Sequence, residues 1–190
     1  MGRHRILPPW VGMIDLRSRR QERTIGIGAA MIQTPKITRS DAQLAAVIRL
    51  VIPRSEIRSV AGPAIAEVMT AVHKQGVGPA GPVFSHHYRM SPETFDFEVG
   101  VPVTESVEAA GRVEPSELPA ATVARCIYTG PYEGLGEAWG EFGAWIKANN
   151  LTPAEDLWEI YLAGPDSSPD PDRWLTELNR PLVGYSAETS

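Results

Sequence analysis

The chain has 190 residues, of which 43% are hydrophobic and 22% are charged, fractions typical of a soluble globular protein. They exclude a fully disordered chain, a collagen-like chain and a coiled coil. The single cysteine, Cys126, excludes an internal disulfide and a zinc site built from four cysteines or from two cysteines and two histidines. Because there is no run of about 18 apolar residues and no apolar signal segment, we expect a cytoplasmic protein without a membrane span, a metal or another cofactor.

The net charge of −5 is unevenly distributed along the chain. Residues 1–36 carry +5, and residues 37–190 carry −10. An acidic body is a poor match for nucleic acid, which requires clustered positive charge. It favours cationic small molecules, although weakly.

Residues 1–34 form a segment without sustained hydrophobic periodicity, and they include a basic cluster at Arg17, Arg19, Arg20 and Arg23. We expect a disordered tail here. A second interpretation is that Met31 is the natural start and that the upstream residues are an artefact of the gene model. A third is an arm that binds nucleic acid or a membrane surface.

The first recognisable element is an apolar, β-branched run at residues 45–52, which predicts a strand. A short helical turn is expected at residues 54–61. Gly62-Pro63 then predicts the start of the main helix, because proline at the first helical position loses no hydrogen bond. The helix is expected to end at Gln75-Gly76, with Gly76 as a left-handed cap.

Two strands are predicted to follow, at residues 83–88 and 94–103. In the second, Phe95, Phe97, Val99 and Val101 alternate with Asp96 and Glu98, which is the period of a strand. Residues 111–118 are predicted to be a polar connector.

The second half repeats this order, with a strand at 121–128, a helix at 131–149, and strands at 156–162 and 174–182. The predicted fold class is therefore α+β, with two pseudo-symmetric β-α-β-β modules whose antiparallel sheets form a central ligand cleft. The modules are expected at residues 45–103 and 121–184, with a connector at 104–120. They form one domain over residues 35–184, followed by a tail at 185–190.

Glu159 is the main candidate site residue, because it lies in a predicted strand of otherwise bulky apolar residues. Alternation places Glu159 and Tyr161 on one face of this strand. They either face solvent, or they line an aromatic cavity in which burial raises the pKa of the carboxyl group and a bound cation lowers it again. Most of the aromatic residues lie after Ala121, and aromatic rings around one acid suit flat or cationic organic molecules.

Other polar groups carry weaker signals. His86 and His87 are adjacent, so they point to opposite faces of a strand and cannot hold one metal ion together. Ser85 and His87 share a face, but no G-x-S-x-G motif surrounds the serine, so we assign no catalytic role to them. Cys126 is expected to be a buried, unreactive thiol.

Four segments together resemble one family, the GyrI-like small-molecule-binding superfamily, which includes the effector-binding domains of bacterial multidrug-responsive regulators. They occur in the usual order of that family, and the resemblance spans residues 35–183. The segments are Phe97–Val103 (FEVGVPV), Tyr128–Tyr132 (YTGPY), Trp158–Tyr161 (WEIY) and Asp170–Leu178 (DPDRWLTEL).

The resemblance implies two β-α-β-β modules related by a pseudo-twofold axis, with a ligand cleft between them. Glu159 looks like the family glutamate that lies at the bottom of an aromatic pocket and pairs with cationic drugs. Trp174 resembles the pocket aromatic of the last strand. Tyr161, Tyr128 and Tyr88 are looser assignments as ligand-binding residues.

The resemblance leaves three functions open. The first is a small-molecule binding protein for aromatic or cationic xenobiotics. The second is a hydrolase of strained, cyclopropane-containing xenobiotics, with Glu159 as general base. The third is a protein-interaction or regulatory module. Because only about 34 irregular residues precede the domain, we do not expect direct transcriptional control by this chain alone. From the acidic charge we expect no nucleic-acid binding through the domain, and we expect no membrane partner.

Overall fold

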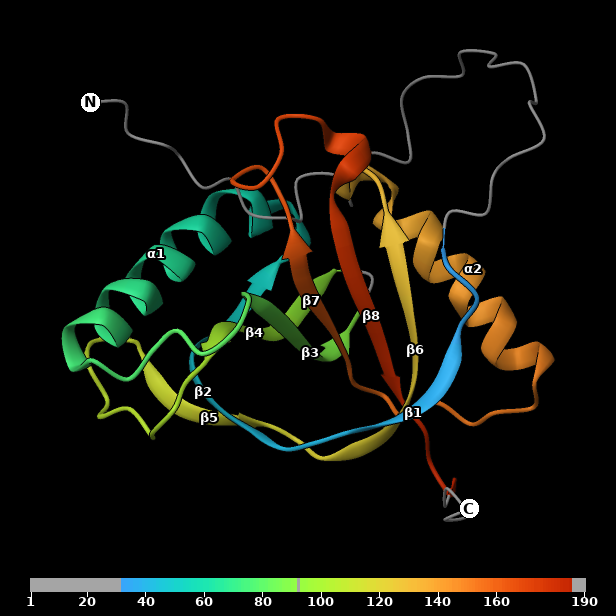
Figure 1. Ribbon diagram of the computed structural model, residues 1–190, viewed down its shortest axis with the longest axis horizontal. Coiled ribbons are helices and arrows are strands. Elements are labelled where there is room, and N and C mark those ends of the chain that lie inside the picture. The colour runs from blue at the N-terminus through green and yellow to red at the C-terminus, as the bar shows by residue number, and fades with distance from the viewer. Residues whose placement is uncertain (1–31, 92, 186–190) are drawn as a thin grey trace.

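The computed structural model describes residues 32–91 and 93–185. Their strands form one eight-stranded antiparallel sheet in the order β1-β6-β8-β7-β3-β4-β2-β5, curled into a half-barrel with two helices (Figure 1). The strands are β1 (Lys36–Ser40), β2 (Gln43–Pro53), β3 (Phe84–Met90), β4 (Thr94–Pro102), β5 (Glu114–Leu118), β6 (Ala121–Thr129), β7 (Leu157–Ala163) and β8 (Leu175–Pro181). The helices are α1 (Ile57–Gln75) and α2 (Leu135–Ala148), with short 3₁₀ turns η2 (Arg54–Glu56), η3 (Tyr132–Gly134) and η4 (Pro171–Arg173).

The predicted repeat is confirmed, because β2-α1-β3-β4 and β6-α2-β7-β8 have the same element order and both contribute to this sheet. The modules meet where β3 pairs with β7, with Ser85 opposite Glu159 and His86 opposite Trp158. The fold is therefore the α+β arrangement expected from the sequence.

The sequence analysis missed two strands, β1 and β5. β5 lies within the segment that was expected to be a polar connector, and no strand was expected at 36–40. Both are short edge strands in which most residues are exposed or half-buried, so they lack the apolar alternation by which strands are recognised. β1 pairs with β6 and β5 pairs with β2, so each module receives its edge strand from the segment that precedes the other module.

The start of α1 was also predicted wrongly. The helix begins at Ile57, and Pro63 lies inside it rather than at its first position. Proline removes one hydrogen bond to the preceding turn, but Ala61, Ala64 and Ile65 around it are buried, and this packing holds the helix through the proline. The predicted cap is confirmed, since Gly76 has φ 72° and its N–H donates to the Val72 carbonyl at 3.0 Å.

Both helices pack on the same face of the sheet. The main core joins apolar residues of α1 and α2 to those of β2, β4 and β6 on that face. A smaller apolar cluster lies on the opposite face and consists of Ala45, Val47, Phe84, Leu118, Val123 and Trp158. The first part of β2 is therefore covered on both sides, which explains its continuous apolar run Ala45–Ile48. Further along the strand, Arg49 and Val51 are exposed.

Some expectations concern the ends of the chain. The basic cluster and Met31 lie outside the described residues, as do residues 186–190. The described chain begins with Ile32, which is buried and forms an isolated bridge with Tyr128, while the Gln33 N–H donates to the Ile127 carbonyl at 2.8 Å. Across residues 32–91 and 93–185, no helix has the length and apolar character needed to cross a bilayer.

Candidate functional site

A polar cluster lies between the two helices, on the helix-covered face of the sheet. α1 packs on β2 and β4, and α2 packs on β6. The central strands β3 and β7 contribute Ser85, His87, Glu159 and Tyr161 to this face. Glu159 is only 2% exposed, which excludes the interpretation that it faces solvent.

Glu159 is the centre of a continuous hydrogen-bond network. Trp139, on α2, donates from Nε1 to Glu159 Oε1 at 2.6 Å, and the Tyr161 hydroxyl donates to Oε2 at 2.7 Å. Ser85 Oγ lies 2.8 Å from the Tyr161 hydroxyl, and His87 Nε2 lies 3.2 Å from Ser85 Oγ. The network therefore links one helix and both central strands.

The electrostatics of Glu159 are set by burial. Removal from water raises the pKa of its carboxyl group, and hydrogen bonds from Tyr161, Trp139 and Ser85 offset only part of this rise. Over residues 32–91 and 93–185, no Lys or Arg side chain forms an ion pair with Glu159. Among the described residues, the carboxylate consequently has hydrogen-bond donors but no Lys or Arg partner to compensate its charge.

A row of aromatic rings extends from the carboxylate toward the loop before β8. Tyr161 and Tyr132 meet edge to face with centroids 6.0 Å apart, and Tyr132 lies 4.7 Å from Trp174. The Trp174 Nε1 donates to the Ser168 carbonyl at 2.9 Å, which fixes this indole on the loop. Burial, with Asp166 and Glu159 nearby, raises the pKa of Tyr132 to about 12, so it stays a neutral phenol.

Three of the five residues predicted from the sequence form one group. Glu159 and Tyr161 are in contact, and Tyr132 connects them to Trp174, which lies directly before β8 rather than within it. Tyr128 lies on the same face, but its hydroxyl donates to the Pro131 carbonyl at 2.8 Å and thereby holds the turn before α2.

Tyr88 is not brought to Glu159. Its ring lies 4.4 Å from that of His86, and the Arg49 guanidinium lies 4.4 Å above it. His86 pairs with Trp158, the neighbour of Glu159 that points to the opposite face. The structure therefore places Tyr88 on the other side of the sheet.

Sequence reasoning missed four members of the cluster. Trp139 was assigned only to the apolar stripe of its helix, and Tyr132 was not assigned a role. Ser85 and His87 were seen to share a face, but they had no partner. The missing information was the β3–β7 pairing, which places Ser85 directly opposite Glu159.

The described residues include no group of three or more His, Cys, Asp or Glu side chains arranged to hold a metal ion. Cys126 is buried, and burial raises the pKa of its thiol to about 12. Such a thiol stays protonated and is a poor nucleophile.

The structure thus joins two β-α-β-β modules in one sheet, with a buried carboxylate and aromatic rings between their helices. Residues 33–182 match the family model of the GyrI-like small molecule binding domain. The chain belongs to this family. A comparison with curated protein sequences found no significant match.

Several solved structures share the fold. The C-terminal domain of EcmrR superposes with a TM-score of 0.69 at 20% identity, covering 82% of this chain and 99% of that domain. EcmrR in its DNA complex gives a TM-score of 0.70 at 20% identity over 81% of this chain, which spans only 58% of the EcmrR chain. SAV2435 bound to tetraphenylphosphonium gives 0.59 at 11% identity, covering 80% of this chain and 95% of SAV2435.

A protein from Listeria innocua described as a hydrolase gives a TM-score of 0.51 at 14% identity, covering 78% of this chain and 91% of that protein. All these identities are low, so the similarities establish the fold and do not transfer an activity.

Proposed function

We propose that this chain binds aromatic or cationic xenobiotics between its two helices, with Glu159 as the charge partner. The observation that carries the proposal is a carboxylate that is 2% exposed and has no ion pair among the described residues. A bound cation would supply the missing positive charge and lower the pKa of the carboxyl group toward its ordinary value. The GyrI-like family and the tetraphenylphosphonium complex of SAV2435 support this assignment.

The aromatic row gives the ligand its apolar contacts. The rings of Tyr132 and Trp174 extend away from the carboxylate, and aromatic faces attract organic cations. Tyr132 contacts Tyr161, which donates a hydrogen bond to Glu159, and Trp174 continues the row beyond Tyr132. A ligand with an aromatic body and a positive centre would use both parts of the cluster.

Access to the carboxylate requires a local change. The Trp139 indole N–H donates to Oε1 of Glu159. A cation that approaches from the helix side therefore displaces or reorients this indole. The ligand must offset the lost hydrogen bond, which favours ligands with a formal charge over neutral aromatic molecules.

The test is isothermal titration of the full chain with tetraphenylphosphonium. Replacing Glu159 with Gln should weaken binding by about 1–3 kcal/mol, the attraction between two unit charges roughly 6–15 Å apart at an effective dielectric constant of about 20. Glu98→Gln is the matched control, because Glu98 is also a buried glutamate, 3% exposed, on the opposite face of the sheet. Equal affinity of wild type and Glu159→Gln would remove Glu159 from this role.

A second candidate function is hydrolysis of a strained xenobiotic. It is favoured by the hydrogen-bonded series His87–Ser85–Tyr161–Glu159, since a carboxylate with a raised pKa in a dry site suits a general base. Turnover of a cyclopropane-containing substrate in large excess decides between the two. A binding protein saturates at one equivalent, whereas an enzyme continues, and Glu159→Gln should then abolish product formation.

A further inference from the structure

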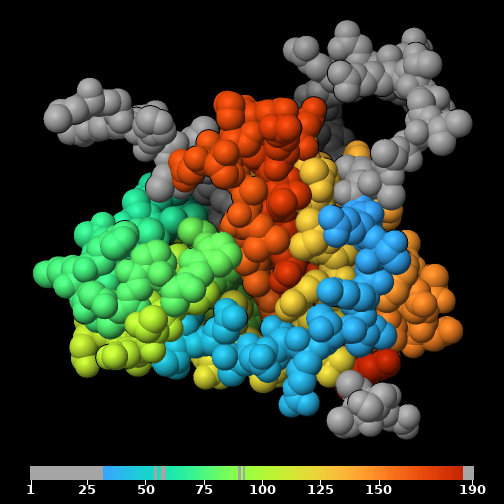
Figure 2. All heavy atoms as spheres, in the orientation of Figure 1, coloured from blue at the N-terminus to red at the C-terminus, as the bar shows by residue number. Residues whose placement is uncertain are grey.

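A groove of about 550 Å³ lies on the face of the sheet opposite the helices. It is bordered by the β1–β2 junction, the segment before β3 and the end of β7. In Figure 2 these segments, in blue, green and orange, meet on the front of the molecule. The volume is in the range of sites for small organic ligands.

The floor and part of the rim of the groove are apolar. Phe84 and Trp158 form the floor and are almost completely buried. Leu44 and Leu162 line the same groove and are 42% and 46% exposed, which makes them two of the most exposed large apolar side chains described. An apolar body placed in the groove would remove both leucines from water.

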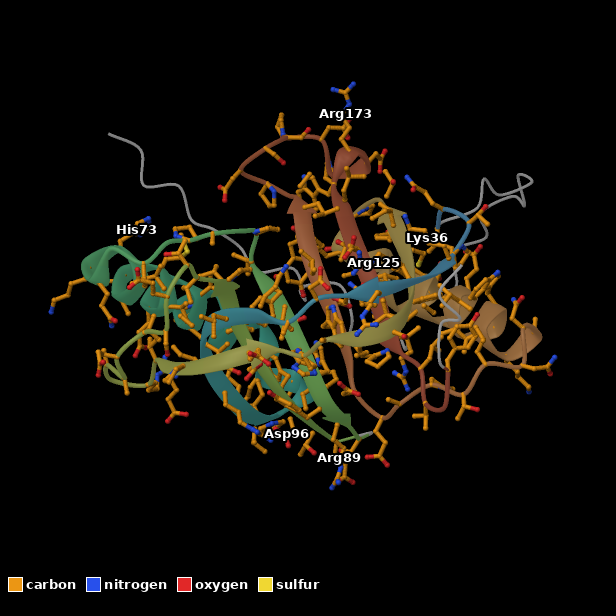
Figure 3. All side chains as sticks on the ribbon, turned by 60° about the horizontal axis from the view of Figure 1, so that its bottom comes forward. Lys36, His73, Arg89, Asp96, Arg125 and Arg173 are labelled. Atoms are coloured by element: carbon orange, nitrogen blue, oxygen red, sulfur yellow. The ribbon has the colours of Figure 1, made fainter. Side chains whose placement is uncertain are left out.

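One wall of the groove is charged. Arg125 on β6 and Glu177 on β8 both line it, with Arg125 Nε 3.3 Å from Glu177 Oε1 and 2.7 Å from Asn179 Oδ1. Within the described chain, the two terminal nitrogens of Arg125 and Oε2 of Glu177 make no hydrogen bond. Figure 3 shows Arg125 near the middle of the molecule, beside Lys36 of β1. The wall therefore offers hydrogen-bond donors on Arg125 next to an acceptor oxygen on Glu177.

The charges of this wall disfavour ligands that carry only one charged group. A carboxylate ligand would meet Arg125, but also Glu177 beside it. An amine would meet Glu177, but also the guanidinium. A ligand that carries both charges close together satisfies each side.

We propose that this groove is a second binding site, which takes a zwitterionic aromatic α-amino acid. The carboxylate pairs with the terminal nitrogens of Arg125, the ammonium pairs with Oε2 of Glu177, and the ring lies over Phe84 and Trp158 between the two leucines. A planar guanidinium suits a carboxylate because it can donate two parallel hydrogen bonds.

This site is distinct from the Glu159 cluster. Trp158 and Glu159 are neighbours on β7, so their side chains point to opposite faces of the sheet. Glu159, Tyr161 and Trp139 do not line the groove. The inference thus does not depend on the proposed xenobiotic site.

The test uses three indole probes that differ only in charge: tryptophan, tryptamine and indole-3-propionate. Each is titrated into the ¹⁵N-labelled full chain, and amide shifts of Gly81 and Leu162 report the groove, while the Trp139 indole N–H reports the Glu159 cluster. Tryptophan should bind about tenfold more tightly than either singly charged probe, as expected for one charged hydrogen-bonded contact. Saturable shifts should appear at Gly81 and Leu162 and not at Trp139.

Two variants remove the two charges of the wall one at a time. Arg125→Gln should shift the preference toward tryptamine, and Glu177→Gln should shift it toward indole-3-propionate. Leu162→Arg should block all three probes without loss of the fold, because Leu162 is exposed, and Glu159→Gln should leave tryptophan binding unchanged. The proposal is overturned if a singly charged probe binds the groove as tightly as tryptophan, if shifts concentrate at Trp139, or if no saturable shift appears.

Discussion

Trp139 on α2 and Glu159 on β7 are joined by a hydrogen bond of 2.6 Å from the indole Nε1 to the carboxylate Oε1. This bond connects the helix that covers the second module to a strand at the centre of the sheet. A buried carboxylate that loses such a donor keeps its full desolvation cost. The indole nitrogen therefore supports both the helix position and the ionised state of Glu159.

Trp139→Phe should destabilise the protein by about 1.5–3 kcal/mol near neutral pH, because it removes a hydrogen bond to a charged, buried group while it keeps most of the ring. Urea unfolding measures the change. Trp145→Phe is the matched control, since Trp145 lies on the same helix, is half-buried and makes no described side-chain hydrogen bond. Equal losses in the two variants would show that ring volume, and not the indole N–H, accounts for the effect.

The raised pKa of Glu159 predicts that stability and cation binding change with pH in opposite directions. Burial raises this pKa, so the contribution of Glu159 to stability is present below the ordinary pKa of glutamate and is lost as pH rises through the folded value. Relative to Glu159→Gln, the wild-type protein should therefore lose stability with rising pH. Binding of tetraphenylphosphonium should strengthen over the same interval, because the cation pairs with the ionised form.

Titration calorimetry with tetraphenylphosphonium between about pH 4.5 and 8, a range that starts near the ordinary pKa of glutamate, measures the second dependence. Glu159→Gln should give a flat profile. If wild type and variant follow the same profile, another group controls the pH dependence of binding.

Local patterns in the sequence were sufficient to predict the repeat. β4 alternates strictly, with Phe95, Phe97, Val99 and Val101 buried in the core, and Gly76 ends α1 as expected. Such features depend on neighbours along the chain. β1 and β5 depend instead on pairing with strands from the other module, and their polar sequences do not contain that information.

The candidate site could also be predicted only where it depends on neighbours along the chain. Period-2 alternation correctly placed Glu159 and Tyr161 together. It could not show that the β3–β7 pairing adds Ser85 to them, or that α2 points Trp139 at the carboxylate. Tyr88 was misplaced for the same reason, because only the β3–β7 pairing shows that Ser85, and not His86 or Tyr88, shares the face of Glu159.

His86 forms a second buried charge cluster, at the contact between the modules. Its Nε2 lies 3.0 Å from Asp156 Oδ2, and its Nδ1 lies 3.5 Å from Glu98 Oε1. Burial alone lowers the pKa of His86, but hydrogen bonds and charge from Asp156 and Glu98 outweigh this, and the pKa is raised. The resulting stabilisation is present below the ordinary pKa of about 6.5 and is lost as pH rises through the folded value.

Asp156→Asn should therefore lower the pKa of His86 and reduce the loss of stability above about pH 6.5, the ordinary pKa of histidine. NMR titration of the His86 ring measures the pKa, and urea unfolding at several pH values measures the stability. Glu155→Gln serves as the control, since Glu155 is the adjacent acid and makes no described contact with His86. An unchanged His86 pKa in Asp156→Asn would contradict this account.

Replacing two glycines in different surroundings with alanine should change the stability of the protein in opposite directions. A Cβ added at Gly100, on β4, would collide with the Ala46 carbonyl oxygen and with Val47 on the paired strand, whereas a Cβ at Gly140, in the middle of α2, meets nothing within 4 Å. Gly100→Ala should cost about 1–3 kcal/mol, the range for overpacking, because a paired backbone cannot move aside easily. Gly140→Ala should stabilise by about 0.5–1 kcal/mol, because alanine is favoured over glycine inside a helix. Urea unfolding of both variants measures these changes, and a neutral Gly100→Ala would show that β2 and β4 can separate locally without cost.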